Sequence, residues 1–407
     1  MDDISLSSMV LVPAIAVAAP LLGRLLGRLI PVPLVVFEIL LGLLLGPAVL
    51  GWVHPGGFLE VLSQFGLAML FFLAGNEIDF ATIKGRPMKR AVLGWLISLV
   101  AGVLVGIALA PTVGAGIFIG VALTSTALGT LLPVLRDAGE LKTPFGIAVL
   151  AVGAIGEFGP LLAISLFLGG RSPGVAAIVL IAFAAIAGLA IWVAARGYGR
   201  RLHRVITSTI HTSGQFAVRL VMFTLFTLSA LSIMFGLDML LGAFAAGILY
   251  RLLLTGAPEK DAEAIESKLE AVGYGFLVPV FFIDTGLSFD LAALLGDTRN
   301  LLLLPIFLLL FLVVRGLPSV IAAPPGAARA DRVAIGLMGA TALPIIVAVT
   351  NIGVDEGDLT TGTAASLVGA GLLSVLLFPL LGLAFRKRSP DYTPAAPDKD
   401  AFIVEEG

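Results

Sequence analysis

The chain has 407 residues, of which 58% are hydrophobic and 13% are charged, and its formal net charge is −2. An apolar fraction this far above the one half of ordinary soluble domains excludes a soluble globular protein and predicts an all-α polytopic membrane protein. The chain has no cysteine, which excludes disulfides, thiolate metal ligands and a thiol nucleophile. We expect membrane lipid around the helices and no nucleic-acid partner.

Apolar stretches suited to crossing a bilayer recur along the whole chain. The first one is not preceded by the positive segment of a signal peptide, so we expect it to be retained as a helix. The thirteen predicted spans cover residues 8–23, 31–50, 58–78, 91–110, 113–134, 145–168, 174–195, 213–234, 236–254, 271–291, 300–321, 331–351 and 362–384. An odd number of spans places the two termini on opposite sides of the membrane.

The basic residues predict which terminus faces the cytoplasm. Nearly all of the 25 Lys and Arg residues follow odd-numbered spans, whereas Arg171 and Arg299 lie in loops on the other side. The positive-inside rule then places the N-terminus outside and the C-terminus in the cytoplasm, in the cell inner (plasma) membrane.

The spans and their loops predict one membrane transport domain over residues 1–388. Residues 389–407 carry Pro, Asp and Lys, which predicts a short disordered cytoplasmic tail. The longest loop, residues 255–269, is rich in charge, and we expect either a short interfacial helix or a charged linker there.

Glu157 is the single acid in the apolar stretch from Phe145 to Leu168, at about mid-membrane depth. A charged, unpaired carboxylate at that depth is costly, so an intramembrane acid indicates proton or cation handling. The alternative is an acid that is hydrogen-bonded to a neighbouring helix for packing.

Three short motifs of the first half recur in the same order in the second half, at nearly the same offset. The pairs are Thr126-Ala-Leu128 with Thr341-Ala-Leu343, Gly139–Thr143 with Gly357–Thr361, and Phe71-Phe72 with Phe281-Phe282. The predicted topology runs the two Thr-Ala-Leu spans in opposite directions across the membrane. Inverted repeats of this kind are typical of secondary transporters.

Both Thr-Ala-Leu spans carry residues that break helices. Thr124–Thr130 combines hydroxyls with a glycine, and Gly339–Pro344 places a glycine and a proline around a threonine. If both helices break at mid-membrane and cross, free carbonyl and N–H ends meet there and can help to bind an alkali cation. The alternative is that the hydroxyls bond back to their own helices. The expected ion- and proton-binding residues are Glu157, Thr124, Ser125, Thr126 and Thr341.

These segments together resemble the cation:proton antiporter superfamily, in the branch that includes Kef-type exchangers. The resemblance is carried, in order, by Phe71–Gly75, Thr124–Leu128, the Glu157 stretch, Pro279–Phe282 with Gly286, and the segments from Thr341 to Ser374. It implies two discontinuous crossing helices, a homodimer, and a gate domain beside a core domain that spans mainly residues 91–168 and 300–384. It also implies an elevator-like movement of the core.

The resemblance places Glu157 where the family has its ion-binding aspartate. Gly156 stands where electrogenic sodium/proton members have a first aspartate. A lone carboxylate suggests that one proton is exchanged for one Na⁺ or K⁺, with no cofactor. Arg315 looks like the basic residue that other members carry near the crossing. It would pair with Glu157 or neutralise the carbonyl ends; the alternative is an arginine that snorkels to the membrane surface.

Two other acidic positions are of interest. Asp284 lies deep in a predicted span, where it could be a second titratable group or a partner for Arg315. The alternative is that it caps a local break of the helix before Gly286. Glu77, with Asn76 beside it, lies at the inner end of a span, where we expect a solvated mouth.

A sodium-coupled symporter of a small organic anion shares the inverted-repeat architecture and remains the alternative function. Such a protein would offer basic or amide groups at the crossing, for which Gln215 and Asn351 are weakly placed. A channel would need a continuous polar path, which a lone mid-membrane acid does not supply. The chain has neither His-Glu-x-x-His nor Gly-x-Ser-x-Gly, so we do not expect an enzyme.

Overall fold

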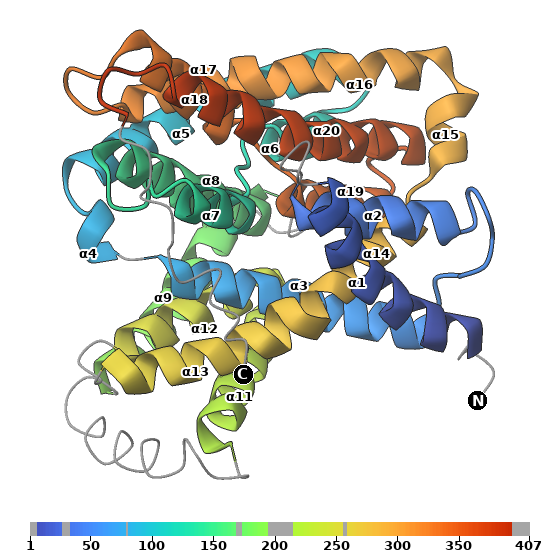
Figure 1. Cartoon of the computed structure of the whole chain (residues 1–407), viewed down its shortest axis with the longest axis horizontal. Helices are drawn as coiled ribbons and strands as arrows, with labels where there is room; N and C mark the ends of the chain where they lie inside the picture. Colours follow the sequence, from blue (N-terminus) through green and yellow to red (C-terminus); the bar gives the residue numbers. More distant parts are fainter. Residues whose placement is uncertain are drawn as a thin grey trace, which may run out of the picture.

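The computed structural model describes residues 6–26, 33–78, 80–167, 173–193, 215–254 and 259–392, and the regular elements in these ranges are helices (Figure 1). The first ten are α1 (Leu6–Leu26), α2 (Leu34–Leu45), α3 (Gly57–Glu77), α4 (Phe80–Ile83), α5 (Arg86–Leu109), α6 (Val113–Ala122), α7 (Leu128–Asp137), α8 (Pro144–Phe167), α9 (Pro173–Val193) and α11 (Phe216–Met234). The others are α12 (Met239–Leu254), α13 (Glu259–Val272), α14 (Val278–Leu287), α15 (Leu291–Gly296), α16 (Thr298–Leu310), α17 (Leu317–Ser319), α18 (Arg329–Gly339), α19 (Pro344–Asp355) and α20 (Thr361–Arg386).

Each predicted span corresponds to an apolar helix of the structure, and two of the spans are broken into two helices. In the described ranges, nine apolar helices are long enough to cross a membrane, and four more apolar helices are shorter. Together they correspond to the thirteen predicted spans, so the all-helical membrane fold is confirmed. Of the predicted tail, residues 389–392 are described and Ser389 is buried, whereas residues 393–407 lie outside the described ranges.

The charged segment before the tenth predicted span forms a helix that is continuous with that span. α13 runs into α14 through one π-helical turn, Gly273–Leu277. Ile265 and Leu269 on α13 are buried, because this face packs on the protein. The prediction of an interfacial helix is therefore right about the helix and wrong about its separation from the span.

Two helices break inside the membrane region, as the Thr-Ala-Leu motifs predict. α6 ends at Ala122 and α7 begins at Leu128; α18 ends at Gly339 and α19 begins at Pro344. Proline has no N–H to donate and is well suited to the first turn of a helix. The intervening residues of both breaks are buried, so their backbone groups need partners within the protein.

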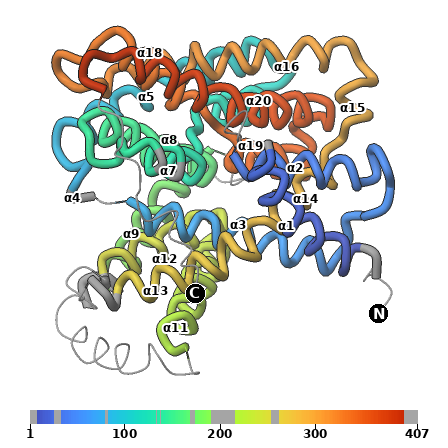
Figure 2. The backbone as a smooth tube through the Cα atoms, viewed as in Figure 1, coloured from blue at the N-terminus to red at the C-terminus, as the bar shows by residue number. Residues whose placement is uncertain are grey.

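The helices pack in two groups. α5 to α8 and α16 to α20 pack mainly on one another, and α1, α2, α3, α11, α12 and α14 form the second group. Figure 2 shows that α14 lies beside α2, although the two are far apart in sequence. Small residues bring the helices close: a Cβ at Gly75 of α3 would clash with the carbonyl oxygen of Phe244 on α12.

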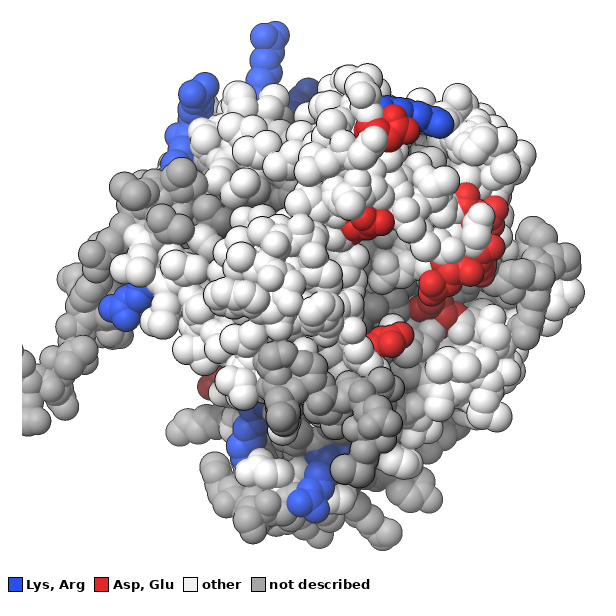
Figure 3. Space-filling view, turned by 90° about the vertical axis from the view of Figure 1, so that its right-hand side faces the viewer, with Lys and Arg blue, Asp and Glu red and all other residues white. Residues whose placement is uncertain are grey.

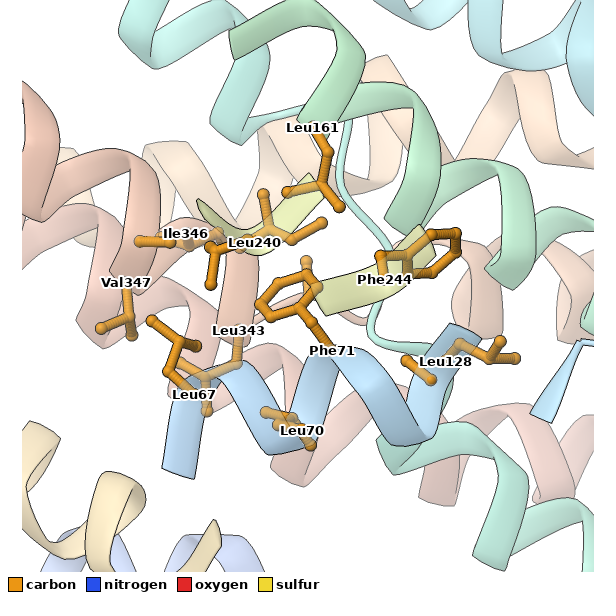
Figure 4. Close-up of a cluster of buried hydrophobic side chains, with 14 of the residues drawn as sticks. Leu67, Leu70, Phe71, Leu128, Leu161, Leu240, Phe244, Leu343, Ile346 and Val347 are labelled. Atoms are coloured by element: carbon orange, nitrogen blue, oxygen red, sulfur yellow. The ribbon is translucent and has the colours of Figure 1, made fainter. Parts of the chain in front are cut away.

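An apolar seam joins the two groups. α3 and α12 contribute side chains from the second group, and α7, α8 and α19 contribute side chains from the first (Figure 4). We define the seam by Leu67, Phe71, Leu128, Leu161, Phe244 and Leu343. It is apolar throughout, so it excludes water where the two groups meet.

Three buried charged residues tie the ends of the first group together. Arg386, at the end of α20, donates to Glu140 in the loop after α7 and to Asp331 at the start of α18, both at 2.7 Å. Ser389 also donates to Asp331, at 2.9 Å. The two broken helices and α20 are therefore held together at one end.

Replacing Arg386 with alanine leaves Glu140 and Asp331 buried without their cation. We expect the Arg386→Ala variant to lose about 3–5 kcal/mol of stability, as is usual when one partner of a buried ion pair is removed. The measurement is thermal unfolding in detergent. Lys387→Ala, at the exposed neighbouring residue, should leave the melting temperature within a degree or two of wild type; equal losses in both variants would contradict the buried cluster.

Candidate cation site at the crossing

The two helix breaks meet each other and helix α8. The N–H of Ala127 donates to the carbonyl oxygen of Thr341 at 2.8 Å, and the N–H of Thr126 donates to that of Gly156 on α8 at 2.9 Å. The hydroxyl of Thr126 donates to the carbonyl oxygen of Gly339, the last residue of α18, at 2.6 Å. Each break thus supplies backbone partners to the other, as a buried irregular segment requires.

Glu157 lies at this crossing with only 1% of its surface exposed. Its Oε2 accepts a hydrogen bond from the N–H of Leu128, at 3.2 Å. Leu128 is the first residue of α7, so the carboxyl group faces the N-terminal end of a half-helix. The partial positive charge of that end favours a carboxylate, and the apolar seam beside it disfavours one.

Arg315 is fully buried beside the crossing and does not snorkel. It lies in a π-helical turn, Phe311–Gly316. Its Nε donates to Thr126 Oγ1 at 2.8 Å and its Nη2 to the carbonyl oxygen of Val152 at 2.7 Å, whereas its Nη1 has no hydrogen-bond partner. Thr126 passes this interaction on to the carbonyl end of α18, so the cation of Arg315 offsets the negative end of a half-helix.

Arg315 and Glu157 do not form an ion pair in this conformation. In the described part of the chain, ion pairs are formed elsewhere, for example between Arg251 and Glu266 and between Arg386 and both Glu140 and Asp331. Of the two predicted roles of Arg315, the geometry therefore matches compensation of carbonyl ends.

The other predicted hydroxyl groups are buried at the breaks and bond to their own helices. Thr124 donates to the carbonyl oxygen of Val121, Ser125 to that of Ala122, and Thr341 to that of Leu337. A hydroxyl that donates in this way keeps its lone pairs, so it can still accept or bind a cation. The structure brings Thr124, Ser125, Thr126, Thr341 and Glu157 to the same pair of breaks.

Gly156 leaves room for Arg315 and Thr126. A Cβ at this position would clash with Thr126 Oγ1 and with Arg315 Nη2. The guanidinium group therefore occupies the space beside α8 that a side chain at residue 156 would need.

Asp284 is not brought to the crossing. It lies on α14, where it lines a cavity of 480 Å³ with Glu60, Ser63 and Thr350, and we call this the Asp284 cavity. Acidic side chains gather on this face of the molecule (Figure 3). α14 packs against α2 and α3, which places Asp284 in the second group of helices, and no ion pair in the described ranges joins it to Arg315.

A second cavity, of 610 Å³, approaches Glu157 from the other end of the molecule. It is lined by Asn76 and Glu77 at the end of α3, by Leu128, and by Ala154 one turn before Glu157. We call it the Glu77 cavity. The apolar seam separates the two cavities, because Leu67 lines the Asp284 cavity and Leu128 lines the Glu77 cavity.

The fold and this buried crossing define a helical membrane transporter. A family model described as the transmembrane part of sodium/hydrogen exchangers matches residues 14–383. The chain therefore belongs to the sodium/hydrogen exchanger family, which confirms the resemblance to cation:proton antiporters and the expectation of a transporter.

Individual relatives agree with this assignment. The chain is 27% identical to the protein YjbQ of Bacillus subtilis, over 95% of this chain and 64% of that protein. It is also 27% identical to a protein of Enterococcus hirae named Na⁺/H⁺ antiporter, over 91% of this chain and 96% of that one. The chain thus spans about two thirds of the first relative and nearly all of the second.

A solved structure shares the fold. The sodium proton antiporter MjNhaP1 of Methanocaldococcus jannaschii superposes with a TM-score of 0.63 at 19% identity, and the match covers 93% of this chain and 98% of that one. At this identity the likeness concerns the fold alone.

Adding a methyl group at Gly156 should disturb the crossing. We expect Gly156→Ala to lose about 1–3 kcal/mol of stability, because Arg315 and Thr126 must move to admit the Cβ. Gly174→Ala is the matched control, since a Cβ there meets no atom within 4 Å. Thermal unfolding of both variants in detergent checks this; a Gly156→Ala variant as stable as Gly174→Ala would show that the crossing is loosely packed.

Proposed function

We propose that the protein exchanges protons for a monovalent cation, Na⁺ or K⁺, at Glu157. The observation that carries the proposal is the buried carboxyl group between two half-helices, whose Oε2 accepts the N–H of Leu128. The family supports it, and so do relatives whose names give Na⁺/H⁺ antiport, together with the Bacillus cereus protein GerN, which is named Na⁺/H⁺-K⁺ antiporter.

Burial explains how one group can exchange two ligands. An uncompensated carboxylate in an apolar setting is unfavourable, so Glu157 is stable when it holds either a proton or a cation. The hydroxyl and carbonyl oxygens around Thr126 and Thr341 supply the hard oxygen ligands that an alkali cation prefers. With one carboxylate, a bound proton and a bound cation exclude each other, and the exchange is electroneutral.

The two cavities support alternating access. In this conformation the Glu77 cavity reaches Leu128 and Ala154, next to Glu157, and the seam closes off the Asp284 cavity. With the orientation that the basic loops predict, the Glu77 cavity faces the cytoplasm and Asp284 faces the outside. The first group of helices, with the crossing, moves against the second along the apolar seam as an elevator, in a homodimer. An empty, charged site crosses poorly, which couples the two ions.

A sodium-coupled symporter of an organic anion is the alternative function. Arg315 is the cation that such a substrate would require, and its Nη1 has no hydrogen-bond partner. The guanidinium group is, however, enclosed by Thr126 and α8 and is only 1% exposed, so it does not face either cavity as an anion site.

Transport in liposomes tests the proposal directly. Addition of Na⁺ or K⁺ outside liposomes with an acidic interior should release protons, reported by dequenching of a pH dye. We expect Glu157→Gln to reduce this signal to that of protein-free liposomes, because glutamine can bind neither a proton nor a cation in exchange. Glu356→Gln, which removes an exposed acid, should transport as wild type does.

The variant comparison also decides between the two functions. Wild-type protein that gives no proton signal with any alkali cation, but takes up an organic anion with Na⁺, would replace the antiporter by the symporter. Equal signals from wild type and Glu157→Gln would remove Glu157 from the exchange site.

A further inference from the structure

Where it lines the Glu77 cavity, the end of α3 presents buried oxygen atoms that have no hydrogen-bond partner among the described residues. Asn76 is 7% exposed, and its Oδ1 accepts no hydrogen bond. Glu77 is partly exposed, but its Oε2 atom is buried and has no hydrogen-bond partner within the described ranges. Both residues line the cavity. A buried acceptor without a partner costs free energy, so two adjacent ones beside a cavity require an explanation.

From the sequence, Asn76 and Glu77 are expected at a solvated mouth, and in the structure they line the Glu77 cavity. Asn76 and Glu77 line the same cavity as Leu128, whose N–H donates to Glu157, and as Ala154, which lies one turn before Glu157. The end of α3 is therefore close to the proposed exchange site, and it lies on the same side of the apolar seam as the Glu77 cavity.

One oxygen of Glu77 is already held in place. The hydroxyl of Tyr274 donates to Glu77 Oε1 at 3.0 Å. Tyr274 lies in the π-helical turn between α13 and α14, and such single turns are frequent at functional sites because they redirect side chains. With Oε1 bound to Tyr274, Oε2 is left for a second ligand.

The end of the helix adds to the preference for a cation. α3 ends at Glu77, and the chain turns to extended backbone at Ile78. The last carbonyl groups of a helix lack donors within it, and together they form the negative end of the helix dipole. These carbonyls, Asn76 Oδ1 and Glu77 Oε2 are oxygen ligands of the kind that alkali cations bind.

Apart from Glu77, the charged side chains that line the cavity are three basic and two acidic residues. Arg136, Lys142 and Arg251 line it together with Glu266 and Glu270, and Arg251 is paired with Glu266 at 3.0 Å. A general attraction of cations to the cavity is therefore weak. A cation would therefore be bound by the local group of oxygen atoms at Asn76 and Glu77, and not by the net charge of the cavity.

We propose that Asn76 and Glu77 form a second cation site, in which Na⁺ or K⁺ is held at the end of α3 before it passes to Glu157. This second site rests on the proposed antiport and adds a step to it. The second site lies on α3, in the second group of helices, whereas Glu157 lies in the first group. A cation waiting on α3 is available to Glu157 only in the conformation in which the Glu77 cavity reaches the crossing. Tyr274 is a positioning residue for this site.

Binding of radioactive sodium or potassium to purified protein tests the site without transport. The Glu157→Gln variant removes the exchange site, and we expect it to retain saturable cation binding. Adding Glu77→Gln should abolish that binding, whereas adding Glu270→Gln, an exposed acid of the same cavity, should leave it intact. Glu77→Gln is isosteric and keeps the bond from Tyr274, so the variant is expected to fold. Glu157→Gln protein that binds no cation would overturn the proposed site.

Transport kinetics give a second, directional test. In membrane vesicles with the Glu77 cavity facing the added cation, Glu77→Gln and Asn76→Ala should raise the cation KM about tenfold, the equivalent of about 1.4 kcal/mol of binding, with little change in the maximal rate. Tyr274→Phe should raise it less. In vesicles of opposite orientation the KM should stay at the wild-type value.

The outcomes separate this site from the exchange site. Wild-type antiport that requires Glu157 but has an unchanged KM in Glu77→Gln would overturn the second site and leave the antiport intact. Wild-type protein without any antiport would overturn the proposed function itself.

Discussion

The structure depends on how backbone groups are satisfied where two helices end inside the membrane. Each break exposes carbonyl and N–H groups in a place where water cannot bind them, which would be prohibitive in isolation. The two breaks solve this by crossing: Ala127 donates to Thr341, and Thr126 joins Gly339 to Arg315. The remaining positive end, at Leu128, holds Glu157. Glu157, the proposed exchange site, is thus one of the partners that the broken helices require, which is why a carboxyl group can lie there.

The helix breaks, the membrane spans and the position of Glu157 could be predicted because each depends on residues that are close together in the sequence. The Gly, Pro and hydroxyl residues of the two Thr-Ala-Leu segments predict the breaks, and the apolar stretches predict the spans, since both depend on residues close together in the chain. A single acid in the stretch from Phe145 to Leu168 marks Glu157 for the same reason. The position of Arg315 in an apolar span likewise marks it in the sequence, but whether its side chain reaches Glu157 or the carbonyl ends depends on packing.

What could not be predicted depends on contacts between distant segments. Asp284 has the depth of a site residue, yet α14 packs on α2 and α3 and places it in another cavity. Asn76 and Glu77 resembled an ordinary polar helix end, and no local pattern indicates that Tyr274, nearly two hundred positions later, donates to Glu77. The π-helical turns that position Tyr274 and Arg315 also lack a sequence signal here. Tertiary packing decides which polar residues share a cavity.

In the proposed exchange, the single carboxyl group of Glu157 carries either one proton or one cation in each half of the cycle. The reversal point of transport tests it most directly: proteoliposomes with defined proton and cation gradients are examined for the condition of zero net flux, with and without an imposed membrane potential. One-for-one exchange at Glu157 predicts zero flux when the two gradients are equal, and no effect of the potential. A reversal point that moves with the potential would mean that more than one proton accompanies each cation, and that a second group shares the exchange.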